Sequence, residues 1–262
     1  MSCEAIAGTV PIYPDLAGKV AVVTGGSRGI GAATCRLLAQ NGAKVAVNGR
    51  DEATIDTVVG GIRGDGGHAI GVSADVTDFG TMEDVRRRVE QELGPVEVLV
   101  AFAGGQGSPT PTEQITEEQW RFVVDANLTA TFLTVKSFLP GMIERRRGSI
   151  VTMASSAGRL PSGASAPYAA AKAGVIMFSR HVANEVGRHG VRVNCLAPAA
   201  VLTERVRRLM PEDTQREVAA SFPLGRMGTP EDVALATLFL ASDSSSWLTG
   251  VTLDVAGGRI MV

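Results

Sequence analysis

A tyrosine and a lysine in the run APYAAAKAG, residues 166–174, have the types and the spacing for proton transfer. Tyr168 and Lys172 are four positions apart in an alanine-rich stretch, and alanine has the highest helix propensity, so the run predicts a helix. Residues four apart lie on one face of a helix, one turn from each other. An ammonium group beside a phenol favours the phenolate and lowers a pKa that is otherwise about 10. The alternative, for this spacing alone, is a buried tyrosine beside a surface lysine.

A glycine-rich turn follows the first predicted strand. The sequence TGGSRGIG places Gly25, Gly29 and Gly31 in a GxxxGxG pattern directly before an apolar helix. Glycine at such positions permits a tight turn and a close approach of the backbone to a pyrophosphate, which the N-terminus of the helix would face. The turn predicts a dinucleotide site, although a glycine-rich turn of this kind can also be purely structural.

The same turn contains the GxSxG elbow of hydrolases, centred on Ser27. A serine hydrolase of that kind needs a histidine base on a late loop. The three histidines are His68, at the start of the third predicted strand, and His181 and His189, in and just after the helix of the tyrosine. Because none lies at a late strand tip, the sequence disfavours a hydrolase.

Composition and charge favour a globular protein and disfavour several other classes. Of 262 residues, 45% are hydrophobic and 20% charged, enough for a sizeable core. The net charge of −2 at pH 7 gives no basic footprint for nucleic acid or an anionic membrane. Three scattered cysteines without a CxxC spacing indicate neither a disulfide framework nor a metal site, and they fit a reducing cytoplasm. No apolar run reaches the ~18 residues of a membrane span, and the first residues lack a signal-peptide pattern.

Short β-branched runs alternate with longer helical segments along the chain. Seven strands are predicted, at residues 19–24, 44–48, 68–73, 96–101, 149–153, 191–196 and 251–255. The helices between them are predicted at residues 29–41, 52–63, 78–93, 116–146, 166–188 and 230–241. Several strands are apolar on both faces, as in a parallel sheet covered on both sides. We therefore expect a Rossmann-like, doubly wound α/β fold with a seven-stranded parallel sheet flanked by helices.

The alternation continues without a linker or an internal repeat, which favours one domain. Residues 1–17 are predicted to be an N-terminal extension and residues 18–262 a dinucleotide-binding catalytic domain. The segment 199–228, rich in charges and containing Pro211 and Pro223, interrupts the pattern before the last helix. We expect this segment to be a substrate loop or lid.

Together the motifs resemble those of the short-chain dehydrogenase/reductase family. The resemblance rests on the glycine turn, on Ser155 placed thirteen residues before Tyr168, and on the spacing from Tyr168 to Lys172. It extends from about Leu16 to the C-terminus. Further matches are the segments 74–78 (ADVTD), 125–132 (DANLTATF), 193–203 (VNCLAP with a later threonine) and 226–250. Within the family the sequence looks closest to the 3-oxoacyl-carrier-protein reductases.

The resemblance implies catalytic roles for four residues. Tyr168 would be the general acid in carbonyl reduction and the general base in the reverse reaction, and Lys172 would lower the pKa of the phenol and hold the nicotinamide ribose. Ser155 would donate a hydrogen bond to the substrate oxygen. Ser156 competes for that role but lacks the family's spacing to the tyrosine. Asn127 matches the family's water-holding asparagine, the alternative being a polar residue in a helix bend.

The resemblance also implies the cofactor-binding residues, which come from the glycine turn, the tips of several strands, the catalytic pair and the segment after the sixth strand. They are Gly25, Ser27, Arg28, Gly29, Ile30, Gly49, Arg50, Asp75, Val76, Ala103, Gly104, Tyr168, Lys172, Pro198, Val201 and Thr203. The sequence departs from the family pattern in four places, the fourth being Gly49 at the tip of the second strand. Residues 101–104 read AFAG in place of NNAG, which puts in doubt the sheet hydrogen bonds of those asparagines. Ala199 replaces a glycine, and Ala256 replaces an acid.

The tip of the second strand predicts which dinucleotide is bound. Folds that select NAD place an acidic residue there to hold the ribose, and this chain has Gly49. Arg50 follows it and Arg28 projects from the glycine turn, so two guanidinium groups could flank a 2′-phosphate. We expect NADP(H) to be preferred to NAD(H). Asp51 and Glu52 are alternative ribose acceptors, but they fall at the start of the next helix, where acids act as a cap and first-turn charges.

The expected activity is therefore NADP(H)-dependent reduction of a ketone to a secondary alcohol. The resemblance suggests a 3-oxoacyl thioester of an acyl carrier protein as the substrate, with another small ketone, sugar or cyclic alcohol as the alternative. A function of another class, a non-catalytic dinucleotide sensor or scaffold, is disfavoured because the serine, tyrosine and lysine are all present.

Two surfaces predict partners. The basic residues at 145–147 and 188–189 could dock an acidic carrier protein, or could be solvated helix ends placed favourably against the helix dipole. The helices at 116–146 and 166–188 carry broad apolar faces, and the last strand would be a sheet edge. Because family members pair such surfaces, we expect a homotetramer.

Overall fold

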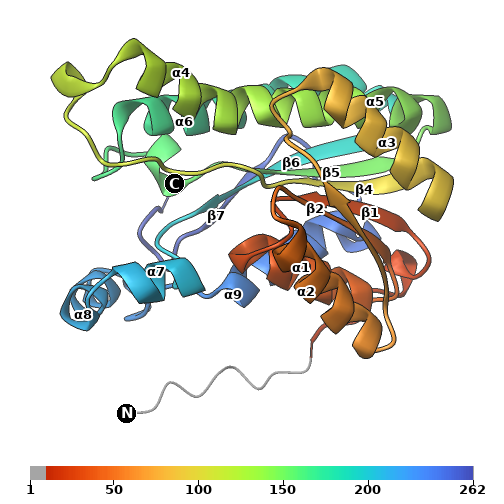
Figure 1. Ribbon diagram of the computed structural model, residues 1–262, viewed down its shortest axis with the longest axis horizontal. Helices are drawn as coiled ribbons and strands as arrows, with labels where there is room; N and C mark the ends of the chain where they lie inside the picture. The colour runs from red at the N-terminus through yellow and green to blue at the C-terminus, as the bar shows by residue number, and fades with distance from the viewer. Residues whose placement is uncertain (1–9, 262) are drawn as a thin grey trace.

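A seven-stranded sheet, parallel throughout, runs through the middle of the computed structural model, which describes residues 10–261 (Figure 1). The strands are β1 (Val20–Thr24), β2 (Lys44–Gly49), β3 (His68–Ser73), β4 (Val96–Ala101), β5 (Gly148–Met153), β6 (Val191–Pro198) and β7 (Thr252–Val255). Their order in the sheet is β3-β2-β1-β4-β5-β6-β7. The order reverses between β1 and β4, which makes that place the switch point where ligands of such folds bind. The predicted fold class and all seven predicted strands are confirmed.

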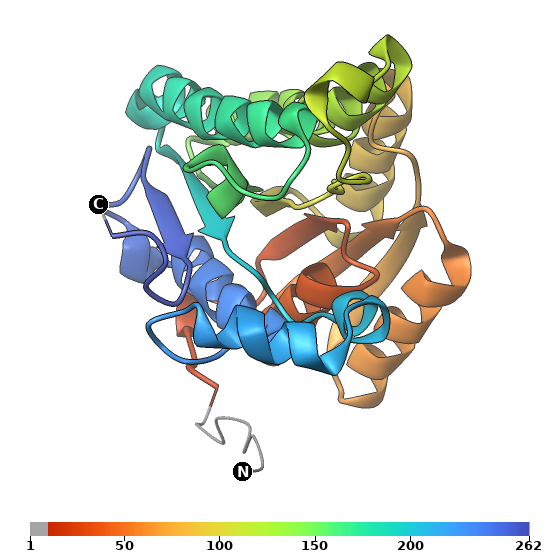
Figure 2. The same ribbon diagram turned by 90° about the vertical axis from the view of Figure 1, so that its left-hand side faces the viewer.

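Helices form a layer on each side of the sheet (Figures 1 and 2). They are α1 (Gly29–Gln40), α2 (Glu52–Gly64), α3 (Phe79–Leu93), α4 (Glu117–Val124), α5 (Ala130–Arg145), α6 (Ala166–Val186), α7 (Glu204–Leu209), α8 (Glu212–Ala220) and α9 (Pro230–Ala241). One layer contains α1, α2 and α9, and the other contains α3, α5 and α6. Right-handed crossovers place α3, α5 and α6 on the face opposite α1 and α2. The helix α9, between β6 and β7, departs from this rule, because it returns to the layer of α1 and α2 and packs against α1.

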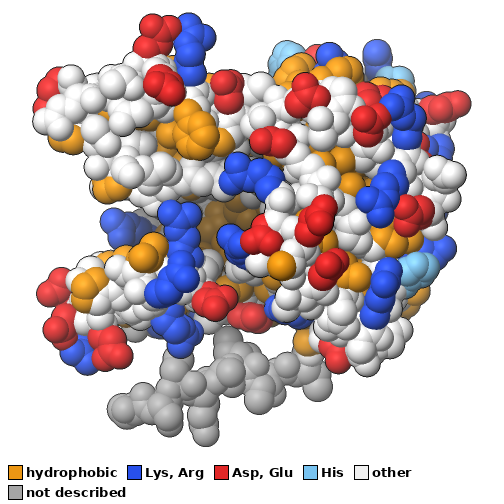
Figure 3. All heavy atoms as spheres, viewed as in Figure 1, with side chains coloured by type: hydrophobic (Ala, Val, Ile, Leu, Met, Phe, Trp, Pro, Cys, Tyr) orange, Lys and Arg blue, Asp and Glu red, His pale blue; other side chains and the backbone are white. Residues whose placement is uncertain are grey.

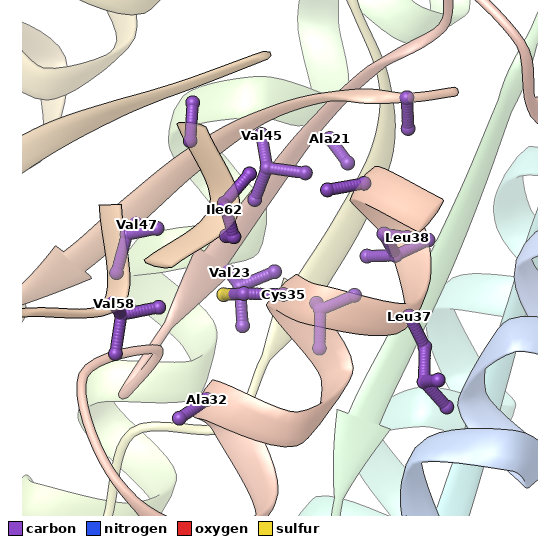
Figure 4. Close-up of a cluster of buried hydrophobic side chains, with 14 of the residues drawn as sticks. Ala21, Val23, Ala32, Cys35, Leu37, Leu38, Val45, Val47, Val58 and Ile62 are labelled. Atoms are coloured by element: carbon purple, nitrogen blue, oxygen red, sulfur yellow. The ribbon is translucent and has the colours of Figure 1, made fainter. Parts of the chain in front are cut away.

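The two largest hydrophobic clusters lie on the two faces of the sheet, and alternate residues of the same strand enter each one. Val23 packs under α1 and α2 together with Cys35 and Ile62 (Figure 4). Val22 packs on the other face under α3 and α5, beside Phe138. Every residue of β1 is buried. Strands covered on both faces need apolar side chains at every position, which explains the continuous valine runs.

The predicted helix at 116–146 is divided by a π-helical stretch at Asp125–Thr129, between α4 and α5. The buried Asn127 lies in this stretch and donates hydrogen bonds from its amide to the carbonyls of Val123 and Gly105. Single-turn π-bulges of this kind occur frequently at functional sites. The π-helical stretch holds this polar side chain against the backbone of Gly105, just after β4.

Length and composition alone would let Glu117–Arg145 cross a membrane. Its apolar side chains have another explanation, because α5 packs against β4 and α3, and α4 packs against α6. Helices that are largely buried in a protein core pass the same test of length and hydropathy.

The segment after β6 forms α7 and α8. A bridge between Val201 and Gly228 closes its base, and Thr203 caps α7 by accepting a hydrogen bond from the Val206 amide at 3.3 Å. Figure 3 shows the molecule hollowed between the part that carries α4 and the part that carries α7 and α8. The segment predicted to be a lid therefore borders this hollow.

Residues 10–17 pack against the start of the sheet. The Leu16 side chain is fully buried in the core under α1, and the Tyr13 amide donates a hydrogen bond to Asn41 Oδ1 at 2.7 Å. The rest of the predicted extension, residues 1–9, lies outside the described residues.

Candidate active site

The glycine turn joins β1 to α1 at the switch point. Gly25 has a φ of +66°, in the region that favours glycine. A Cβ atom added at Gly31 would overlap the Gly25 carbonyl oxygen, so only glycine fits where the helix begins. Arg28, the N-cap residue of α1, makes no side-chain capping bond within the described chain. The first amides of a helix lack intrahelical partners, and a pyrophosphate would satisfy them here.

A cavity of about 930 Å³ opens beside this turn. Nine of the predicted cofactor-binding residues line it, namely Gly25, Ser27, Arg28, Gly49, Arg50, Asp75, Val76, Ala103 and Gly104. They come from the carboxyl ends of β1 to β4, which meet at one edge because the strands are parallel. The volume lies in the range of cofactor sites. The glycine cradle and the two arginines fit a phosphate-bearing dinucleotide.

The other predicted cofactor residues lie outside the lining of this cavity. They are Gly29, Ile30, Pro198, Val201, Thr203, Tyr168 and Lys172. Thr203 is nevertheless close to the glycine turn, since its methyl group lies 3.3 Å from the position of a Cβ atom added at Gly29.

Twelve lining residues were not predicted. They are Asn48, Asp51, Ala74, Thr77, Gly105, Gln106, Gly107, Phe122, Asp125, Ala126, Thr129 and Arg205. Most are chain neighbours of predicted residues, so a wider window around each motif would have included them. Arg205, on α7 in the lid, follows the predicted Thr203 by two residues and falls within the same kind of window.

The charges at the tip of β2 are partly paired. Asp51 caps α2 by accepting a hydrogen bond from the Thr54 amide at 3.3 Å, which confirms the predicted cap. It also accepts one from the Arg28 guanidinium at 2.5 Å, an ion pair in an exposed position. Hydrogen bonds from Thr77 hold the pKa of Asp75 below its usual value, and the charge of Arg50 adds to this effect. The cavity thus presents two arginines at this end, one with a carboxylate partner.

Ser155 and Tyr168 form a hydrogen-bonded pair at the end of β5. Burial raises the pKa of the Tyr168 phenol, and the Ser155 hydroxyl opposes this by donating to the phenol oxygen, but burial is the larger effect. The Ser155 Oγ also accepts a hydrogen bond from the Ala157 amide at 3.2 Å, which fixes the serine at the start of the short turn before α6. Tyr168 is therefore protonated at neutral pH.

Lys172 lies one turn further along α6, buried, with its Nζ 5.6 Å from the centroid of the Tyr168 ring. The ammonium donates a hydrogen bond to the Met153 carbonyl at 2.8 Å. Burial lowers the pKa of Lys172 to about 8. The sequence predicts that this lysine lowers the pKa of the phenol, and the structure differs, because the phenol pKa is raised. The amine points toward β5 and has no hydrogen bond to the phenol oxygen.

Asn127 and Lys172 meet at Gly104. A Cβ atom at Gly104 would lie 2.5 Å from Asn127 Oδ1 and 3.4 Å from Lys172 Nζ. The Asn127 Oδ1 accepts a hydrogen bond from the Gly105 amide at 3.2 Å. A side chain at Gly104 would separate these groups, so the glycine that the AFAG sequence retains is the residue on which their approach depends.

The missing asparagines of that sequence are replaced by a contact from β1. The Thr24 hydroxyl accepts hydrogen bonds from the amides of Phe102 and Ala103, at 3.2 and 3.3 Å. These two hydrogen bonds hold the backbone of the turn after β4 without using any side chain of the turn.

A phosphate cradle at the switch point, close to a half-buried serine and tyrosine and a buried lysine, defines the class of protein: an oxidoreductase that uses a nicotinamide dinucleotide. Residues 19–214 match the family model described as short chain dehydrogenase, which includes the glycine turn and all three of these side chains. The chain belongs to the short-chain dehydrogenase/reductase family, whose members act on CH–OH groups with NAD(P).

Curated relatives align over nearly the whole chain. The 3-oxoacyl-[acyl-carrier-protein] reductase of Chlamydia pneumoniae is 39% identical over 93% of this chain and 97% of its own length. That of Escherichia coli (strain K12) is 37% identical over 94% and 98%. A 2,5-dichloro-2,5-cyclohexadiene-1,4-diol dehydrogenase of Sphingobium indicum is 36% identical over 93% and 96%. Relatives of similar identity thus carry names that imply different substrates.

Solved structures of family members share the fold of this chain over nearly its whole length. A 3-oxoacyl-[acyl-carrier protein] reductase from Brucella melitensis superimposes with a TM-score of 0.90 at 32% identity, over 100% of this chain and 99% of that one. Levodione reductase superimposes with a TM-score of 0.88 at 30% identity, over 93% and 98%.

Proposed function

We propose that the protein is an NADP(H)-dependent reductase that converts a ketone to a secondary alcohol, with a 3-oxoacyl thioester as its substrate. The observation that carries the reductase activity is the hydrogen-bonded pair of Ser155 and Tyr168, both half-buried, with the buried Lys172 one turn away. The dinucleotide supplies a hydride when bound. The chain's own residues must then orient the carbonyl, stabilise charge on its oxygen and donate one proton to it.

In this proposal the substrate oxygen lies between the two hydroxyls. Ser155 donates a hydrogen bond to that oxygen and stabilises its developing negative charge. Tyr168 transfers its proton to the same oxygen, so hydride and proton together complete the alcohol. The raised pKa of the phenol keeps this proton in place at neutral pH. Lys172, with a pKa of about 8, can exchange a proton near neutral pH and is proposed to restore that of the tyrosine. Asn127, beside Lys172 at Gly104, is proposed to hold water on this route.

The preference for NADP(H) is proposed from the tip of β2. Gly49 cannot hold the ribose hydroxyls, and a Cβ atom there would lie 2.7 Å from Ser27 Oγ, so the tip leaves little room for an acidic side chain. Arg28 and Arg50 both line the cavity. A charge-assisted hydrogen bond is worth about 1.5–3 kcal/mol, so one good contact to a 2′-phosphate gives roughly tenfold preference or more.

A 3-oxoacyl thioester is proposed because the two carrier-protein reductases above align over almost the full chain. A small cyclic ketone or alcohol is the second candidate, supported by the dichlorocyclohexadienediol dehydrogenase and levodione reductase. A panel of acetoacetyl thioesters and cyclic ketones with NADPH separates the two. Turnover of a cyclic ketone without any of the thioester would overturn the thioester proposal.

The basic residues at 145–147 and 188–189 do not support carrier docking. They precede β5 and β6, at the amino ends of the strands, whereas the site lies at the carboxyl ends. Arg147 also pairs with Glu97 at 3.2 Å, and Arg145 donates to the Val96 carbonyl at 2.9 Å. Part of this charge is used within the fold, and the rest faces away from the substrate.

A non-catalytic sensor would bind the dinucleotide tightly and turn over nothing. The same panel tests this alternative by absorbance at the nicotinamide band, because absence of any turnover with tight cofactor binding would favour it.

The buried free thiols of Cys35 and Cys195 are compatible with the cytoplasmic location that we propose.

A further inference from the structure

Arg205 reaches the cofactor cavity from the lid. It lies on α7 and lines the same cavity as Arg28 and Arg50, which come from the sheet side. The start of α7 is fixed over the glycine turn, since Thr203 both caps α7 and places its methyl group next to Gly29. Arg205 lies two residues after Thr203, the lid residue that contacts the first turn of α1.

The carboxylates that line the cavity are already engaged by other groups. Asp51 pairs with Arg28, Asp75 accepts hydrogen bonds from Thr77, and Asp125 accepts one from the Thr129 hydroxyl at 2.8 Å. Within residues 10–261, no carboxylate forms an ion pair with Arg205. An arginine without a counter-charge in a cavity built for phosphates is suited to bind one, because its planar guanidinium matches phosphate geometry with two hydrogen bonds.

We propose that Arg205 binds the pyrophosphate of the dinucleotide from the lid side and so holds the lid over the bound cofactor. The pyrophosphate is chosen over the 2′-phosphate because Thr203 sets α7 over Gly29 at the start of α1, where the phosphate cradle lies. Arg28 and Arg50 instead flank Gly49, at the ribose end. The proposal rests on the proposed cofactor site and adds a specific residue to it.

The proposed contact between Arg205 and the cofactor couples closure of the lid to binding of the cofactor. A ligand that contacts both α1 and α7 favours the conformation in which they are close, by its difference in affinity for the two lid positions. The bound cofactor should therefore order α7, and loss of the Arg205 contact should leave α7 accessible even when the cofactor site is full.

The test compares Arg205→Gln with Arg207→Gln, because Arg207 lies on the same short helix but does not line the cavity. Isothermal titration calorimetry measures the dissociation constants of NADP⁺ and NAD⁺. We expect Arg205→Gln to weaken both by a similar factor of about ten or more. Arg207→Gln should change neither. Arg50→Gln, at the ribose end, should weaken NADP⁺ more than NAD⁺.

Limited trypsin digestion supplies a second measurement, because the bonds after Arg207 and Arg208 remain in the Arg205→Gln variant. At saturating NADP⁺, α7 should be protected in the wild-type protein and cut in the variant. Unchanged affinity and protection in Arg205→Gln would overturn the proposal, as would a loss confined to NADP⁺. A wild-type protein that binds neither dinucleotide would instead refute the proposed cofactor, a result distinct from an unchanged variant. Circular dichroism melting of each variant checks that the fold is retained.

Discussion

At the scale of single residues, burial shifts the pKa values of one hydroxyl group and one amine in the site. Tyr168 lies beside Ser155 with its pKa raised, and Lys172 is buried with its pKa lowered to about 8. Both shifts favour the neutral form of the group, because burial penalises the charged one. Two neighbouring groups that are neutral at mildly alkaline pH suit a reaction in which a proton enters and leaves the site.

Tyr168→Phe removes the transferable proton and keeps the ring. We expect kcat to fall by about 10²–10⁴-fold, the usual contribution of a positioned acid, with little change in NADP⁺ affinity. Steady-state kinetics with the best ketone substrate and calorimetric titration of NADP⁺ measure the two effects. Tyr13→Phe is the matched control, since Tyr13 is the only other tyrosine and lies outside the site. More than about a tenth of wild-type kcat in Tyr168→Phe would exclude this residue as the main acid.

The buried Lys172 should make stability depend on pH. Its folded pKa of about 8 lies below the ordinary lysine value of 10.5, so between these values the unfolded chain binds more protons and the free energy of unfolding rises with pH. From pH 8 to 9.5 the gain is roughly 2 kcal/mol, since one pKa unit corresponds to about 1.4 kcal/mol. The buried thiols and Tyr168 have raised pKa values and act in the opposite sense.

A comparison with Lys172→Met measures the contribution of this group together with its charge interaction with the Cys195 thiol, because the thiols and the tyrosine are present in both proteins. Urea unfolding of the cofactor-free proteins at pH 8 and 9.5, at one protein concentration, gives for each protein the change in the free energy of unfolding between the two pH values. We expect the wild-type protein to gain stability relative to the variant as the pH rises. A relative change of zero, or of opposite sign, would mean that Lys172 is not buried with a lowered pKa.

At the scale of elements, the contact between the turn after β5 and the helix α6 sets the catalytic spacing. A Cβ atom at Gly158 would lie 2.6 Å from the Lys172 carbonyl carbon, and neither backbone can move without displacing the other. We expect Gly158→Ala to destabilise the protein by about 1–3 kcal/mol through overpacking, and to lower kcat by moving Ser155 relative to Tyr168. Thermal unfolding and steady-state kinetics measure both effects.

Gly163→Ala serves as the control for this substitution. Gly163 lies in the same connection, and an added Cβ atom there meets no atom within 4 Å. It should leave both stability and kcat nearly unchanged. Equal effects of the two substitutions would show that the close approach at Gly158 does not position the site.

The tip of β2 should decide the choice of dinucleotide. Gly49→Asp with Arg50→Ala restores a ribose acceptor and removes one phosphate partner, so the preference should move toward NADH by tenfold or more, about 1.4 kcal/mol. Ser27→Gly is added because Ser27 Oγ would otherwise lie 2.7 Å from the new Cβ atom. The ratio of kcat/KM for NADPH and NADH is the measurement, with Ser27→Gly alone as the control. The idea fails if the wild-type enzyme prefers NADH, or if the triple variant keeps the full original ratio.

At the scale of the whole molecule, we propose a homotetramer. The outer surfaces of α5 and α6 expose Phe132 (41%) and Met177 (61%), and the edge strand β7 exposes Leu253 (39%). Two separate surfaces of this kind can pair around two symmetry axes. Light scattering at micromolar concentration should give four times the chain mass of 27.2 kDa. A monomeric mass would refute the proposal. The double substitution Phe132→Glu and Met177→Glu places charges in the proposed α5 and α6 interface, so it should reduce the tetramer to dimers.

The sequence by itself determined the sheet, the glycine turn and the tyrosine–lysine spacing, because each follows from local rules. A strand buried on both faces requires a nearly continuous run of apolar residues, as in β1. A turn with no space for a Cβ atom requires glycine, as at Gly31. A four-residue spacing in a helix brings two side chains to one face, as for Tyr168 and Lys172. The boundaries of the seven strands could therefore be predicted to within a few residues.

Only the tertiary structure decided contacts between segments distant in the sequence. The π-helical stretch brings Asn127 to Lys172 at Gly104, the lid brings Arg205 to the cavity, and Thr24 replaces the missing asparagines after β4. It also reversed the expected direction of the Tyr168 pKa, since burial outweighs any effect of the lysine one turn away. Burial and loop placement depend on how all elements pack, and no short sequence window contains that information.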